Sequence, residues 1–78
     1  MQDQRTLSEI AAEIEAEWTN VKDAARPYLD AMAALQSVGD SYGFESGTGV
    51  VLYFLANAGG WRGEVARRVK AELKAMVA

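Results

Sequence analysis

The sequence predicts an all-α fold, a small helical bundle in a single domain (residues 1–78) that self-associates. Apolar residues recur at steps of three and four along much of the chain, which is the period of an α-helix. Residues that can cap a helix stand before these apolar series. Half of the 78 residues are hydrophobic, which is more apolar surface than so short a chain easily buries.

The N-terminal helix is predicted to begin after Thr6. The segment Thr6–Glu9 is a capping box, in which the Thr6 hydroxyl accepts from the Glu9 amide and the Glu9 carboxylate reaches back. The apolar series that follows keeps one helical phase and consists of Leu7, Ile10, Ala11, Ile14, Trp18, Val21, Ala25, Tyr28, Met32 and Leu35.

Pro27 interrupts this series without shifting its phase. A proline inside a helix removes one hydrogen bond and clashes with the preceding turn. One interpretation is a long helix from Leu7 to about Val38, kinked near Asp23–Pro27. The other is two helices with a break near Thr19–Arg26. The unshifted phase favours the kinked helix, which two shorter C-terminal helices would follow.

The segment Val38–Gly47 is expected to be a loop, because three glycines end the helical pattern. Ser46 or Thr48 can cap the next helix, which covers Gly49–Ala58 and ends in a glycine C-cap. The β-branched and aromatic residues of this segment also allow a strand. As a helix it is apolar on every side and must be covered on every side, which one neighbouring helix cannot do. This is a second reason to expect an oligomer.

The last helix is predicted to start near Gly60 or Trp61 and to run to the end of the chain. Its core stripe comprises Val65, Val69, Leu73 and Met76, with Ala66 and Val77 beside them. Arg67, Lys70 and Lys74 share a separate basic face.

The composition excludes several kinds of chemistry. The chain has no cysteine and no histidine, so disulfides, Cys/His zinc sites and triads that need a histidine are absent. Catalysis by two carboxylates needs opposed groups in a cleft, and the carboxylates of the first helix predict none; they are Glu9, Glu13, Glu15 and Glu17. We therefore expect neither an enzyme nor a cofactor nor a metal site.

The absence of cysteine and the hydropathy pattern predict a cytoplasmic protein. Met1–Thr6 is polar and no apolar signal-peptide region follows it. The longest apolar run, Val50–Ala56, falls far short of the roughly 20 residues that a membrane span requires. The net charge of −3 argues against duplex DNA as a partner.

The segment Gly59–Glu64 carries the most chemical information. Glycines before a helix leave its first amides free, and these amides with the helix dipole favour an anion. Arg62 adds a planar donor suited to phosphate, and Trp61 can stack on a base. The competing interpretation is that Gly59 and Gly60 form a turn, Trp61 fills the core and Arg62 pairs with a carboxylate.

Two further pairs of residues complete the candidate ligand-binding set. Arg67 and Arg68 can contact phosphate, or they can belong to a solvated face. The loop aromatics Tyr42 and Phe44 can close over a ligand, or they can fill the core or a subunit interface. Neither a Walker pattern nor GxGxxG is present. The whole candidate set is Gly60, Trp61, Arg62, Gly63, Arg67, Arg68, Tyr42 and Phe44.

Three pieces of the chain, Trp18–Val21, Pro27–Met32 and Tyr53–Arg68, resemble small proteins of tailed phages and prophages. The likeness is one of overall pattern and covers most of the chain from Trp18 onward. It implies an accessory protein, a class that includes inhibitors of host defence. Some of these are helical oligomers that sequester nucleotide signals, and others block a host protein. The resemblance assigns no functional residues.

Together these features predict a non-catalytic, homo-oligomeric binder that sequesters a phosphate-bearing small molecule or nucleotide signal. Two alternatives stay open. One is a protein–protein inhibitor of a host defence complex that uses the acidic first helix. The other is a structural or DNA-associated phage protein.

Overall fold

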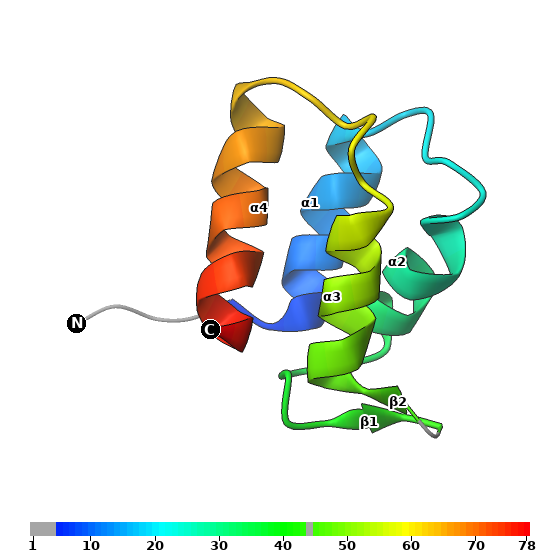
Figure 1. Ribbon diagram of the computed structural model, residues 1–78, viewed down its shortest axis with the longest axis vertical. Coiled ribbons are helices and arrows are strands. Elements are labelled where there is room, and N and C mark those ends of the chain that lie inside the picture. The colour runs from blue at the N-terminus through cyan, green and yellow to red at the C-terminus, as the bar shows by residue number, and fades with distance from the viewer. Residues whose placement is uncertain (1–4, 44) are drawn as a thin grey trace.

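The computed structural model describes residues 5–43 and 45–78, most of which are helical (Figure 1). The elements in chain order are α1 (Leu7–Glu17), α2 (Arg26–Ala33), β1 (Ser41–Tyr42), β2 (Glu45–Ser46), α3 (Gly47–Ala56) and α4 (Glu64–Val77). The helices pack in a ring in which α1 contacts α2, α2 contacts α3, α3 contacts α4 and α4 contacts α1. The prediction of a mostly helical fold is confirmed. The small antiparallel sheet of β1 and β2 was not predicted, so the fold is not all-α.

The N-terminal apolar series forms two helices, so the favoured prediction of one kinked helix is wrong. The capping box of α1 is present: the Glu9 amide donates to Thr6 Oγ1 at 3.1 Å, and the Thr6 amide donates to Glu9 Oε1 at 2.8 Å. Helix α1 ends at Glu17, and α2 begins only at Arg26. Pro27 therefore lies in the first turn of α2, where its missing N–H costs no hydrogen bond.

The break lets α2 fold back along α1. The amides of Leu7 and Ser8, at the start of α1, donate to the carbonyls of Gln36 and Leu35 just after α2, both at 3.0 Å. These bonds satisfy two amides that have no partner inside their own helix. The reversal also lets the apolar faces of the two helices cover each other, which one continuous helix could not achieve.

A short hairpin leads into α3. In its register Ser41 pairs with Ser46 and Tyr42 with Glu45, and Gly43 at the turn has φ +64°. Ser46 then caps α3, because its hydroxyl accepts from the Gly49 amide at 3.1 Å. The prediction of a helix rather than a strand is confirmed, but its cap is Asn57 rather than a glycine.

The outer face of α3 is not covered within one chain. Val50, Val51 and Phe54 are buried in the core, whereas Leu52 is 52% exposed and Tyr53 is 50% exposed. The Tyr53 ring stacks on Tyr28 of α2 with the centroids 5.3 Å apart. Helix α3 is thus apolar on its exposed face as well as on its buried face, but it is not covered on every side within one chain.

Helix α4 starts later than predicted and is the longest helix described, with 14 residues, so the C-terminal helices are not both shorter than the first. Its N-cap is Gly63, whose φ of +110° interrupts the helical backbone there. The predicted stripe packs on the core, with Ala66, Val69 and Leu73 fully covered. No helix in the described part of the chain has the length and apolar character needed to cross a membrane.

Candidate functional site

The connection between α3 and α4 lies at one end of the bundle, next to the connection between α1 and α2 (Figure 1). Residues of both connections line a cavity of about 540 Å³, which we call the tryptophan cavity. From the first connection come Trp18 and Lys22, and from the second come Trp61 and Arg62. The chain reversal after α1 therefore builds half of this cavity.

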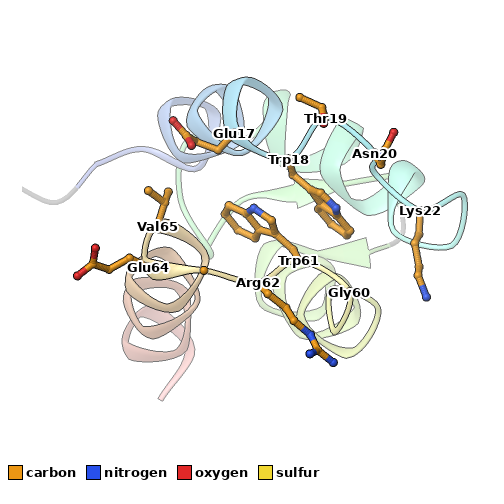
Figure 2. Close-up of a pocket in the computed structure, with 11 residues that line it drawn as sticks. Glu17, Trp18, Thr19, Asn20, Lys22, Gly60, Trp61, Arg62, Glu64 and Val65 are labelled. Atoms are coloured by element: carbon orange, nitrogen blue, oxygen red, sulfur yellow. The ribbon is translucent and has the colours of Figure 1, made fainter.

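Trp61 and Trp18 form a stacked pair at the centre of this cavity lining (Figure 2). Their centroids are 5.8 Å apart with an angle of 11° between the ring planes, and the Phe54 ring meets Trp18 edge to face at 6.2 Å. Trp61 is only 4% exposed and Trp18 only 7% exposed. The geometry favours the core-filling interpretation of Trp61, because its ring face is already occupied by Trp18.

The tryptophan cavity carries charges of both signs. Figure 2 shows the tryptophan side chains between Glu64 on one side and Lys22 on the other. Glu17 also lines the cavity, so two carboxylates accompany the two cations. This balance gives no net attraction for an anion.

A second cavity, of about 330 Å³, shares Trp61, Arg62 and Gly63 with the tryptophan cavity, and all of its charged lining residues are positive. Its charged lining residues are Arg62, Arg67 and Lys70, and no carboxylate lines it. Gly59 and Gly63 also line it, and a Cβ at either glycine would meet no atom within 4 Å. We call this site the cation hollow.

Lys70 ties the cation hollow to the tryptophan pair. Its Nζ donates to the Trp61 carbonyl oxygen at 2.6 Å. Burial lowers the pKa of Lys70, and the neighbouring charges of Lys74 and Arg62 lower the pKa further. The positive charges around Lys70 disfavour its protonated form, and a bound anion would offset this effect.

The helix start that was expected to present free amides at Gly60–Gly63 is not there, because α4 begins at Glu64. The side chain in its first turn is a carboxylate, which takes the position that favours an anion. The positive charge near this connection therefore comes from the side chains of the cation hollow and not from a helix terminus.

The remaining predicted residues lie apart from the cation hollow or are otherwise engaged. Arg68 forms an ion pair with Glu13 of α1. Tyr42 is exposed on the hairpin before α3, at the opposite end of α3 from the Gly59–Gly63 connection. Phe44 lies outside the described residues. Of the predicted set, Arg62, Gly63, Trp61 and Arg67 line the hollow and Gly60 lies beside it.

Two cations near the site were not among the predicted ligand residues. Lys70 stands one helical turn from Arg67, so the basic face of the last helix was the signal that could have identified it. Lys22 carried no such signal. It reaches the site because the chain folds back, and its Cε lies 3.2 Å from where a Cβ on Gly60 would be.

The acidic first helix is partly neutralised within the chain. Glu13 forms ion pairs with Arg5, at 2.7 Å, and with Arg68, while Glu15 pairs with Arg26 at 2.7 Å. Bonds from Arg5 and then Arg68 hold the pKa of Glu13 below its usual value. Of the four carboxylates proposed to meet a basic host surface, Glu13 and Glu15 are therefore engaged in ion pairs, and Glu9 is engaged in the capping box.

Comparison with protein-family models, with curated proteins and with solved structures finds no match to this chain.

Proposed function

We propose that the protein is a non-catalytic binder of a phosphate-bearing small molecule, held in the cation hollow. The observation that carries this proposal is the convergence of Arg62, Arg67 and Lys70 on one hollow that no carboxylate lines. None of these three cations forms an ion pair with a carboxylate of the described chain.

The chemistry of the three side chains suits phosphate. A guanidinium presents a planar fork that binds two phosphate oxygens at once, and an ammonium acts as a compact point charge. Lys70 uses one N–H on the Trp61 carbonyl and retains two further donors. The hollow has about the smallest volume usual for ligand sites, which suits a phosphate group with part of a sugar.

Self-association through α3 is the second part of the proposal. Its sequence from Gly47 to Ala56 contains no charged residue, and Leu52 and Tyr53 are about half exposed. An exposed apolar helix face of this kind is typical of a subunit interface. Since α3 leads directly into the Gly59–Gly63 connection, such an interface would bring the cation hollows of two copies into one assembly.

The resemblance to phage accessory proteins supplies a biological context for this proposal. A counter-defence protein that sequesters a nucleotide signal needs affinity but no turnover, which fits a chain without histidine or cysteine. We therefore propose sequestration of such a signal within the host cell.

Calorimetric titration with a panel of nucleotides tests ligand binding. We expect heat with at least one phosphate-bearing ligand and at least a tenfold loss of affinity in Arg67→Gln, since a hydrogen bond to a charged group contributes about 1.5–3 kcal/mol. Arg26→Gln is the matched control, because it removes the same charge on α2, where Arg26 pairs with Glu15. Absence of heat with every ligand, or equal losses in both variants, would refute the proposal.

Light scattering tests self-association separately. The wild type is expected to be an oligomer, and Leu52→Glu is expected to be a monomer because it places a charge on the exposed apolar face. Ala12→Glu, at an exposed position of α1, is the control and should leave the oligomer intact. A monomeric wild type contradicts the assembly but leaves the binding proposal standing.

A further inference from the structure

The eight lysine and arginine side chains fall into two groups that differ in their partners. Arg5, Arg26 and Arg68 each form ion pairs with carboxylates. The other five form none with any carboxylate in residues 5–43 and 45–78; they are Lys22, Arg62, Arg67, Lys70 and Lys74. Five of the eight positive side chains therefore form no ion pair within the part of the chain that the structure describes.

These five cations form a continuous series, which we call the basic strip. Lys22 and Arg62 share a separate hollow next to the tryptophan cavity, and no carboxylate of the described residues lines this hollow. Arg62 then lines the cation hollow with Arg67 and Lys70. Lys74 follows one helical turn after Lys70 and is near enough to lower its pKa. The strip therefore crosses the Gly59–Gly63 connection and continues along α4.

The basic strip is longer than one phosphate group needs. From Arg67 to Lys74, the helical rise alone spans roughly 10 Å, which equals about three nucleotides of a stacked strand at 3.4 Å each. Arg62 and Lys22 extend the strip beyond the start of α4. A ligand that used all five cations would need a row of negative charges.

We infer that the basic strip binds a linear chain of phosphate groups, centred on the cation hollow. This inference rests on the proposed phosphate binding at the hollow and names the ligand class. The chemistry is shared by the backbone of a single-stranded nucleic acid and by inorganic polyphosphate. A single row of cations matches one row of phosphates, whereas a duplex presents two.

The stacked tryptophans decide how such a chain is recognised. Single-strand binders gain affinity when bases stack on exposed aromatic rings. Trp18 and Trp61 stack on each other and are almost fully buried, so they offer no free ring face to a base. The basic strip therefore recognises the charge and spacing of the phosphates and not the bases. A single-stranded nucleic acid and a polyphosphate with equal numbers of phosphates should bind with similar affinity.

Fluorescence anisotropy of the full chain with a labelled oligothymidylate of about twelve nucleotides tests this inference. Each phosphate contact contributes about −0.7 to the slope of log affinity against log salt for single strands. Five contacts predict a slope of about −3.5 and an affinity loss of about 100-fold between 50 and 200 mM salt. Polyphosphate of equal length is expected to compete within a few-fold of the oligothymidylate.

Two exposed ends of the strip provide the variants. Lys22→Gln and Lys74→Gln should each reduce the magnitude of the slope by about 0.7, while Arg26→Gln, which removes a paired charge of α2, should leave the slope unchanged. All three side chains are exposed, so the fold should survive, and circular dichroism checks that it does.

The competing outcomes are distinguishable. A mononucleotide that binds as tightly as the oligomer overturns the phosphate chain but leaves binding at the hollow intact. If neither the mononucleotide nor the oligothymidylate binds, both the phosphate-chain inference and the proposed phosphate binding at the cation hollow are overturned. Polyglutamate that competes as well as polyphosphate means that the strip takes any polyanion, including an acidic protein, and overturns the phosphate assignment. Tighter binding of duplex than of single strand, or equal slopes in Arg26→Gln and Lys74→Gln, also overturns it.

Discussion

Gly47, the first residue of α3, allows the packing of the fold to be tested by the addition of one methyl group. A Cβ at this position would lie 2.7 Å from Val38 Cα and 2.8 Å from the carbonyl oxygens of Ser37 and Val38. These are backbone atoms, so no side-chain rotation removes the clash. The Gly47 amide also donates to the Asp40 carbonyl at 2.6 Å, and the Thr48 amide donates to the Val38 carbonyl at 3.1 Å. Both bonds hold the start of α3 close to the backbone of residues 37–40.

The cost of Gly47→Ala follows from these distances. Carbon atoms normally pack at about 3.5–4.0 Å, so one segment must move by roughly 1 Å. Overpacking of this kind costs about 1–3 kcal/mol, and the better helix propensity of alanine returns up to about 1 kcal/mol. We expect a net loss of about 1–2 kcal/mol, which for a domain of this size lowers Tm by about 4–16 °C.

Gly59 provides the matched control in the same chain. A Cβ there would meet no atom within 4 Å, and its φ is not positive. Gly59→Ala should therefore be neutral or stabilising by about 0.4–1 kcal/mol, because alanine restricts the unfolded chain. Thermal and urea unfolding of both variants, followed by circular dichroism, provides the comparison. If Gly47→Ala unfolds at the wild-type temperature, the close approach of α3 to Val38 is wrong.

Three further perturbations test other parts of the structure. The ion pairs of Glu13 with Arg5 and Arg68 lower its pKa in the folded state, so they stabilise the fold above the unfolded pKa, near 4.5. This stabilisation is lost as pH falls toward the lower folded pKa, and Glu13→Gln should remove it. An acid-unfolding profile that is unchanged in Glu13→Gln would contradict these ion pairs. Gly63→Ala should cost about 1–2 kcal/mol in urea unfolding, because φ is +110° there, and equal stability would refute that conformation. Phe54→Ala should cost about 3–5 kcal/mol, since the ring is fully buried, and a loss below about 1 kcal/mol would place it outside the core.

Features that depend on neighbouring residues could be predicted from the sequence. The capping box at Thr6 and Glu9 requires only residues three apart, and the Ser46 cap of α3 has the same spacing. The apolar stripe of α4 follows from its helical period. These features form in the predicted places because the interactions lie within one or two turns of the same helix.

The break between α1 and α2 could not be read from periodicity. The apolar residues keep the same phase on both sides of Pro27 in either interpretation, so the pattern does not distinguish a kink from a reversal. The reversal is stabilised by the packing of α2 on α1 and by the hydrogen bonds that the amides of Leu7 and Ser8 donate to the carbonyls of Gln36 and Leu35. These contacts join residues almost thirty positions apart and have no local signature.

The candidate site divides in the same way. The sequence alone determined that Arg62 and Arg67 lie close to a run of glycines between two helices, and that the chain has no histidine and no cysteine. Only the tertiary structure decided that Trp61 packs against Trp18, that Arg68 pairs with Glu13, and that Lys22 joins Arg62. The reason is physical: spacing along one helix places side chains on a face, whereas their partners depend on which helices the burial of apolar surface brings together.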